Sequence, residues 1–190
     1  MDFALSPKHE MMKSMFKDFA EKEVAPVAAE LDEKGEFSWD LFKKMGKLGM
    51  FGLPYPREYG GAGADYLTYV LACEQIAHAC CATAMLLTSQ NSLSSCLIYK
   101  YGTEEQKRKY LTPLITGQEL GAFCLTEADA GSDAANQQTT AVLEGSEWVL
   151  DGSKRFVTNG GLAGIYIVVA RTSGSRGPKG ISIFIVEKDT

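Results

Sequence analysis

The chain has 190 residues, of which 45% are hydrophobic and 23% charged, and its formal net charge is -5. This composition is typical of a folded protein with room for one domain or two small ones, and it argues against a disordered chain. Basic residues alternate with acids in stretches such as KSMFKDFAEKE, which argues against nucleic acid as a partner. No stretch resembles a signal peptide or a membrane span, so we expect a cytoplasmic protein.

Cysteine and histidine usage points away from disulfides and metals. The five cysteines are odd in number and include no CxxC pair, and four of them lie in apolar stretches. We therefore expect buried thiols in a reducing compartment. His9 and His78 are far apart in the sequence, so no metal site is predicted.

Apolar residues recur every three to four positions in the first part of the chain. Ser6 followed by Pro7 is a typical helix start, and Phe16 and Phe19 mark the apolar face of the helix that follows. Ser38 begins a second amphipathic helix. The next stretch, LGMFGLPYPREYGGAGAD, is rich in glycine and proline, so the chain must turn repeatedly there.

Three further helices are expected before the pattern changes. Residues 65–87 are apolar almost all round, which predicts a helix buried at the centre of a bundle, although they are too polar for a membrane span. Residues 91–101 form the next helix. Thr103 and Gln106 match a capping box that starts the last one, and Pro113 lies near its end. About 115 residues are thus assigned to five helices.

After Gly117 the hydrophobic period changes from 3.6 to 2, and short runs of threonine, valine and isoleucine alternate with turn residues. We predict strands at 120–126, 138–144, 148–150, 154–158, 165–171 and 181–186. Helices therefore precede strands, and the fold class is α+β, with a helical domain over residues 1–118 and an antiparallel β domain over 119–190. The last strand is apolar and leaves one edge for another segment or subunit to cover.

The loop in AFCLTEADAGSD is the first candidate site. A strand ending near Thr126 runs into Ala130, Gly131, Ser132 and Asp133, which offer backbone N–H groups, a flexible glycine and hydroxyls suited to a polar heteroaromatic ring or phosphates. The same residue types also form ordinary turns. This loop by itself leaves both interpretations open.

The stretch RFVTNGG is the second candidate. If residues 154–158 form a strand, Phe156 and Thr158 share one face, and an aromatic ring beside a hydroxyl can stack on and hydrogen-bond a flat cofactor. The competing interpretation is that Phe156 belongs to the core and Thr158 to the turn at Asn159. For one isolated strand that interpretation is the better one.

Four stretches together resemble the acyl-CoA dehydrogenase family of flavoproteins over the whole chain. They are LGMFGLPYPREYGGAGAD, YGTEEQKRKYLTPLITGQ, FCLTEADAGSD and LDGSKRFVTNGG. Each is moderately specific, whereas their order and spacing are highly specific. The resemblance implies a helical N-terminal domain, a middle β domain that is truncated here, and a C-terminal helical bundle that is absent from this chain.

The resemblance also implies an FAD site between the β domain and the missing helices. Leu125 contributes backbone and Thr126 a hydroxyl to the ring edge, Phe156 stacks near the isoalloxazine, and Thr158 hydrogen-bonds near N5. Ser132 lies where the FAD and acyl-CoA sites meet and contacts the pantetheine or phosphate part of the substrate. The residues assigned to the cofactor are Phe123, Cys124, Leu125, Thr126, Gly131, Ser132, Phe156, Val157 and Thr158.

The implied reaction is the α,β-dehydrogenation of acyl-CoA thioesters in fatty acid metabolism. A carboxylate base removes the α proton while hydride passes to the flavin. The family's base is a glutamate, usually in the C-terminal domain, and no residue of this chain matches it; neither Glu127 nor Glu58 is assigned that role. Two departures from the family pattern stand out, Ala128 where proline is common and Phe156 where tryptophan is common.

Three hypotheses follow from the resemblance. The first is a dehydrogenase for a short-chain acyl substrate, a homotetramer at full length, which passes electrons to an electron-transferring flavoprotein; the 190-residue chain alone would be inactive and bind FAD weakly. The second is a non-catalytic assembly module, against which both flavin-type threonines argue. The third is an oxygen-using acyl-CoA oxidase or flavin monooxygenase, on which no motif bears.

Overall fold

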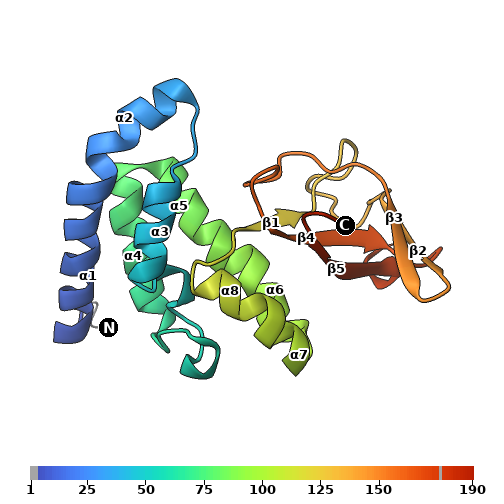
Figure 1. The fold of residues 1–190 in the computed structure, drawn as a ribbon, viewed down its shortest axis with the longest axis horizontal. Coiled ribbons are helices and arrows are strands. Elements are labelled where there is room, and N and C mark those ends of the chain that lie inside the picture. The colour runs from blue at the N-terminus through green and yellow to red at the C-terminus, as the bar shows by residue number, and fades with distance from the viewer. Residues whose placement is uncertain (1–3, 176) are drawn as a thin grey trace. The chain divides into compact units, whose positions relative to one another are not determined.

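The computed structural model describes residues 4–175 and 177–190, and the chain divides into two compact units, one ending at Glu119 and the other running over Leu120–Thr190. The first unit is helical and the second is built on a β-sheet (Figure 1). The predicted α+β class, with helices before strands, is confirmed.

The helical unit is made of α-helices joined by short π-helical segments. The α-helices are α1 (Pro7–Phe19), α2 (Ala25–Lys34), α3 (Trp39–Lys47), α4 (Tyr66–Ala79), α5 (Cys81–Thr88), α6 (Cys96–Tyr101), α7 (Glu104–Gln106) and α8 (Thr112–Ile115). The π-helical segments are Ala20–Val24, Ser89–Ser95 and Lys107–Leu111. Because these segments continue the helices on both sides, α1 and α2 form one helical run, as do α5 and α6, and α7 and α8.

Side-chain caps start the helices where the sequence indicates. Oxygen atoms of Ser6, Ser38 and Asp65 each accept a hydrogen bond from the backbone N–H three residues later, which satisfies one of the unpaired donors of a first turn. At α7, Thr103 and Gln106 form the predicted capping box, with hydrogen bonds of 2.9 and 3.2 Å.

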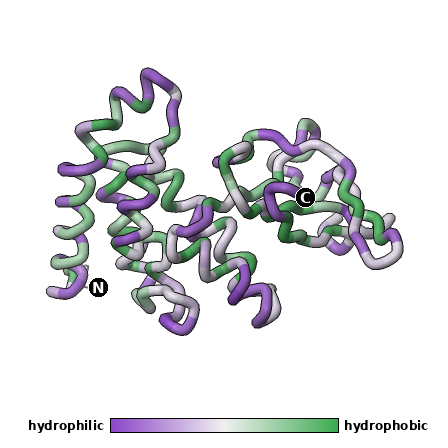
Figure 2. Tube along the Cα trace, in the orientation of Figure 1, coloured by the Kyte–Doolittle hydropathy of each residue, from purple (hydrophilic) through white to green (hydrophobic). Residues whose placement is uncertain are grey.

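The apolar faces of these helices meet in one core. Helix α1 packs along α4, and α8 packs near the turn after α3. The large side chains that are almost completely buried in this unit are Phe16, Met45, Met50, Phe51, Ile76, Leu87, Leu111, Leu114 and Ile115. Figure 2 shows the contrast between such apolar segments and hydrophilic ends such as the turn after α2.

The predicted break between the helices over 65–87 and 91–101 is in the wrong place. The sequence pattern predicts one helix over 65–87 and another over 91–101, but the structure breaks at Cys80, whose backbone is extended (φ -159°, ψ 115°). The helix then continues from Cys81 through Tyr101. It can do so because Asn91, a poor helix former, is buried and donates from its side chain to the backbone carbonyls of Met50 and Leu87.

The β unit contains a twisted sheet of five strands among the described residues. They are β1 (Gly121–Cys124), β2 (Thr140–Glu144), β3 (Glu147–Asp151), β4 (Ile165–Arg171) and β5 (Ile181–Glu187). The order is β1-β4-β2-β3, and β5 also pairs with β4. Strand β4 is the centre of this unit, and Ile165, Ile167 and Val169 are buried on one face of it.

The expected antiparallel sheet is in fact mixed. Strands β2 and β3 form a hairpin and β4 and β5 are antiparallel, but β1 pairs with β4 in parallel, with Gly121 opposite Ile165 and Cys124 opposite Val168. Parallel neighbours require a long connection. Here that connection holds both candidate binding stretches and the hairpin, which is why a simple strand-after-strand interpretation of the sequence missed it.

The strand predicted over 154–158 does not form. Phe156 has a φ of 55°, in the left-handed region, and no strand is assigned between β3 and β4. Consequently Phe156 and Thr158 do not share the face of a strand. The segment is an irregular loop because its groups bond to the chain near β1 instead of to a neighbouring strand: Lys154 donates to the carbonyl of Leu125, and the N–H of Arg155 to that of Thr126.

Two broader expectations can be compared with the structure. Among the described residues, no helix is long and apolar enough to cross a membrane. All five cysteines are reduced, but the expectation that they are buried holds only for Cys124, since Cys81 is exposed and Cys73, Cys80 and Cys96 are half-buried.

Candidate functional site

Strand β1 carries the first group of predicted site residues. Ala122 and Cys124 are buried, whereas Phe123 and Leu125 are only half-buried, as the two-residue period of a strand requires. Burial raises the pKa of the Cys124 thiol. A role for Cys124 in ligand binding therefore has to come from its backbone, while Phe123, Leu125 and Thr126 have accessible side-chain surface.

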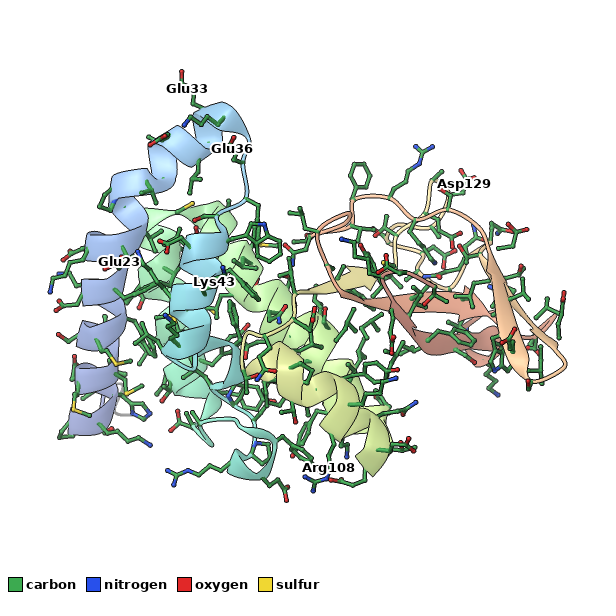
Figure 3. The ribbon with its side chains drawn as sticks, viewed as in Figure 1. Glu23, Glu33, Glu36, Lys43, Arg108 and Asp129 are labelled. Atoms are coloured by element: carbon green, nitrogen blue, oxygen red, sulfur yellow. The ribbon has the colours of Figure 1, made fainter. Side chains whose placement is uncertain are left out.

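The loop after β1 is anchored by a buried carboxylate. Glu127, only 6% exposed, accepts hydrogen bonds from the backbone N–H groups of Gln138 (2.6 Å) and Thr139 (3.0 Å), so the loop closes on itself just before β2. Glu127 also pairs through its backbone with Ala130. Asp129, between these two residues, points away from the sheet (Figure 3).

Lys154 completes this network from the second candidate stretch. Its side chain is 10% exposed, and its ammonium donates to Glu127 Oε1 (2.7 Å), Gln137 Oε1 (2.7 Å) and the carbonyl of Leu125 (3.1 Å). An ammonium has three N–H donors, so each has a partner. Gln137 in turn donates from Nε2 to the carbonyl of Leu125 (3.1 Å).

The network determines the ionisation of Glu127. Burial would raise the pKa of this carboxyl, but the hydrogen bonds from Lys154 and from the residues at 138 and 139 outweigh it and lower the pKa from 4.5 to about 2. Glu127 is thus a permanent anion with both oxygens occupied. Its geometry is that of a structural anchor and not that of a catalytic base.

The two candidate stretches lie side by side in the β unit. Besides the Lys154 contacts, the N–H of Arg155 donates to the carbonyl of Thr126 (2.7 Å), and the side chain of Asn159 donates to the carbonyl of Gly121 (3.0 Å). The loop over 153–161 therefore runs along β1 and is fixed at both ends. Thr126 and Phe156 are brought together by these bonds.

Phe156 stands out on this loop. Its side chain is 92% exposed, and its φ of 55° lies in a region that non-glycine residues rarely adopt. An exposed aromatic ring gains little from burial in the described chain, and the left-handed backbone costs about 1 kcal/mol or more. Strain of this kind is typical of ligand-contacting positions.

Several polar side chains of the same two loops have no hydrogen-bond partner among the described residues. Within the described residues, the hydroxyls of Thr126, Ser132 and Thr158 make no hydrogen bond, and both threonines are half-buried while Ser132 is exposed. A Cβ added at Gly131 would meet nothing within 4 Å, so the loop is open there. Val157 is half-buried and accepts through its carbonyl from Gly160.

A polar cleft of about 560 Å³ is lined in part by the same loop. Arg171, from the end of β4, donates to the carbonyls of Ala135 (2.7 Å), Gln137 (3.1 Å) and Ser175 (2.6 Å). All of these acceptors are backbone oxygens, so Arg171 holds the loop shape. The lining residues are Asp133, Ala135, Asn136, Gln138, Arg171, Gly174, Ser175 and Gly177.

Three residues of this site were not identified from the sequence. Lys154, Gln137 and Arg171 hold the loops through contacts 12 to 36 positions apart in the chain. The one available signal was that Lys154 and Glu127 are opposite charges next to apolar strands, where a buried charge needs a partner. Sequence alone gives no reason to pair these two in particular.

The donor set fits a flat heteroaromatic cofactor with polar edges. It offers one exposed aromatic face, three hydroxyls without internal partners and loop backbone next to them, which is the chemistry that an isoalloxazine ring requires. It does not fit a metal ion. Within residues 4–175 and 177–190, no three histidine, cysteine, aspartate or glutamate side chains lie together where they could hold one.

Comparison with known families gives two matches that cover nearly all of the chain. The model of the acyl-CoA dehydrogenase N-terminal domain matches residues 6–118, and that of the acyl-CoA dehydrogenase middle domain matches residues 122–190. The boundary between the two matches falls at the start of β1.

Individual relatives agree with these matches. A short-chain specific acyl-CoA dehydrogenase of Clostridium acetobutylicum is 50% identical over 188 residues, covering 99% of this chain and 50% of the relative. An acryloyl-CoA reductase (NADH) of Anaerotignum propionicum is 45% identical over 192 residues, covering 100% and 48%.

A solved structure is similar in three dimensions as well. The butyryl-CoA dehydrogenase of Megasphaera elsdenii has a TM-score of 0.93 and 43% identity, and the match covers 99% of this chain and 50% of that chain. The chain therefore spans about half the length of the relatives it matches.

Proposed function

Since this chain belongs to the acyl-CoA dehydrogenase family, we propose that it supplies the flavin-contacting part of an enzyme that introduces a double bond between the α and β carbons of acyl-CoA thioesters. The observation that carries this proposal is the exposed, backbone-strained Phe156 on a loop that is hydrogen-bonded to Thr126, together with three hydroxyls on these two loops that have no hydrogen-bond partner among the described residues. The names of the relatives support the thioester chemistry.

The cofactor is FAD, which when bound supplies the acceptor for the hydride that leaves the β carbon. Phe156 offers its ring face for stacking, and the hydroxyls of Thr126 and Thr158 are free to hydrogen-bond the polar edge of the ring. Phe123, Cys124, Leu125, Gly131 and Val157 line the same site, Cys124 through its backbone.

The substrate is a short-chain acyl-CoA. Two of the similar proteins are described as short-chain specific and as a butyryl-CoA dehydrogenase. Ser132 is exposed on the open loop and serves both ligands, contacting the pantetheine or phosphate part of the thioester. No residue of this chain matches the family's glutamate base, and Glu127 does not take that role, because it is fully engaged as an anion with Lys154 and two backbone donors.

The remaining proposals concern the intact enzyme. It is a cytoplasmic homotetramer that delivers electrons to an electron-transferring flavoprotein. These proposals rest on the family resemblance, and size-exclusion chromatography and electron transfer to the purified partner flavoprotein test them directly.

A second candidate is the reverse reaction, the reduction of an α,β-unsaturated acyl-CoA. The observation that favours it is the 45% identity to an acryloyl-CoA reductase (NADH). A flavin site of this design serves either direction, because the direction depends on the electron donor or acceptor that the flavin meets and not on the residues that stack on it.

The decisive experiment follows the flavin absorbance of the intact, purified protein. Anaerobic mixing with butyryl-CoA should bleach the flavin band, and electron-transferring flavoprotein should restore it. Reduction of acryloyl-CoA without oxidation of butyryl-CoA would support the second candidate, and rapid peroxide formation in air would support an oxidase. A colourless protein that does not bind added FAD would overturn the proposal in favour of a non-catalytic assembly module.

A matched pair of threonine variants localises the effect. Thr158→Val removes a hydroxyl that is available to a ligand and should slow the bleaching by about ten-fold or more, as expected for the loss of one hydrogen bond to the reacting ring. Thr140→Val alters an exposed threonine on the β2 hairpin and should leave the rate unchanged.

A further inference from the structure

A buried ion pair connects the two proposed flavin-contacting segments. Glu127 and Lys154 are 27 positions apart in the sequence, and their charged atoms are 2.7 Å apart. We propose that Glu127 and Lys154 are a positioning pair that fixes the two segments at 125–126 and 155–158 around the cofactor and, because their charges cancel, keeps either charge from shifting the reduction potential of the bound flavin. The inference rests on the proposed function.

The pair is completely satisfied within the β unit. Each of the three ammonium protons of Lys154 has an acceptor, and each carboxylate oxygen of Glu127 has a donor. With side-chain exposures of 10% and 6%, neither charge is screened appreciably by solvent. Any substitution of one partner therefore leaves the other as an uncompensated charge in a region of low polarity.

The pair is connected to both segments by hydrogen bonds. Lys154 and Gln137 both donate to the carbonyl of Leu125, and the next carbonyl, that of Thr126, accepts from the N–H of Arg155. Phe156 follows immediately. The position of the stacking ring relative to the Thr126 hydroxyl is thus set by bonds that depend on the ion pair.

An uncompensated charge at Glu127 or Lys154 affects the reduction potential of the flavin, which a purely packing role would not. Reduction adds electrons to the flavin, so a nearby uncompensated cation favours reduction and a nearby uncompensated anion opposes it. Glu127→Gln leaves the Lys154 ammonium unpaired, and Lys154→Met leaves the Glu127 carboxylate unpaired. A pair that only stabilised the fold would make both variants lose stability without moving the potential in opposite directions.

The test uses the intact FAD-containing protein and measures two quantities, the dissociation constant of FAD and the reduction potential of the bound flavin by dye-coupled titration. Both single variants should weaken FAD binding by about ten-fold or more. Glu127→Gln should raise the potential and Lys154→Met should lower it. The matched control is the exposed pair Glu30 and Lys34, whose variants Glu30→Gln and Lys34→Met should change neither quantity.

The double variant Glu127→Gln, Lys154→Met guards against misfolding of the single ones. It removes both charges, so its potential should lie close to that of the unaltered protein while FAD binding stays weaker. The inference would be overturned if both single variants shifted the potential in the same direction. It would also be overturned if neither single variant shifted the potential and the double variant bound FAD normally. Failure of the unaltered protein to bind FAD would instead overturn the proposed function, so the two failures are distinguishable.

Discussion

The helical unit and the β unit are stabilised by different kinds of buried contact. The helical unit buries large apolar side chains from many helices, and several of its helix starts are satisfied locally by caps. The β unit has a thinner apolar layer on β4, and its long connections are fixed by buried charges, above all Glu127 and Lys154. The first design produces a scaffold, whereas the second fixes loops that are free to contact a ligand.

Two phenylalanines illustrate the difference. Phe51 is completely buried and packs against Phe42, with ring centroids 4.9 Å apart. Phe156 is 92% exposed on a left-handed backbone. The same residue type is thus buried in the core of one unit and exposed on the surface of the other. Residue type therefore says little about the role of a side chain until its exposure and backbone geometry are known.

The largest expected effect would sharpen this comparison in the helical unit. Phe51→Ala should lower the free energy of unfolding by about 4 kcal/mol, because it removes a fully buried ring and leaves a cavity. Hydrogen exchange by mass spectrometry should show the loss of protection in residues 39–115. If the β unit lost protection and the helical unit did not, the assignment of Phe51 to the helical core would be contradicted.

The next effect tests the charge-based design of the β unit. Lys154→Met should cost about 3 kcal/mol, because the Glu127 carboxylate remains buried without its partner. Adding Glu127→Gln should recover part of the loss, as measured by denaturant titration of all four proteins of the cycle. If the double variant is as unstable as the sum of the single ones, the pair contributes no coupling and the comparison fails.

A smaller effect depends on pH. The pKa of Glu127 is lowered from 4.5 to about 2 in the folded state, so its stabilising contribution is fully present above about pH 4.5 and is lost as the pH falls toward 2. Protection of the β unit against hydrogen exchange should therefore decrease between pH 5 and pH 3, about the range where the free carboxyl titrates. Glu127→Gln should flatten this dependence, and an unchanged slope would argue against the assignment.

Asp65 provides the corresponding group in the helical unit. The pKa of Asp65 is lowered from 3.8 to about 2. The largest cause is the hydrogen bond from the backbone N–H of Thr68, followed by those from the Thr68 hydroxyl and from His9. Asp65 is about half exposed, so its share of the acid sensitivity should be screened by salt, unlike that of the buried Glu127.

The smallest effect has the opposite sign. Phe156→Gly should raise the free energy of unfolding by up to about 1 kcal/mol, since glycine adopts a positive φ without strain. The same variant should weaken FAD binding, which fluorescence titration measures. A loss of stability comparable to that of Phe51→Ala would show that Phe156 packs against other groups and would end the contrast between the two rings.

Much of the fold was predictable because it depends on local patterns. Ser6, Ser38 and Thr103 start helices as expected, since a capping hydroxyl reaches only three residues ahead. Strand β4 has the bounds that its apolar run predicts, and the run after it forms β5. The structure also brings together the two segments of the β unit to which the resemblance assigns the candidate site.

The remaining features depend on contacts between distant residues. Nothing in Ala79, Cys80 and Cys81 signals a helix break, because none is glycine or proline. The run around Phe156 has the alternation of a strand, yet it has no neighbouring strand to pair with and is held by Lys154 and Arg155 against β1 instead.

The sequence by itself determined the class of fold, the helix starts and the family, because caps, periodicity and motif order are properties of neighbouring residues. Only the tertiary structure decided the parallel pairing of β1 with β4, the left-handed Phe156 and the partners of Glu127. The physical reason is that a buried charge or a strand edge specifies that it needs a partner, while the path of the whole chain specifies which partner it meets.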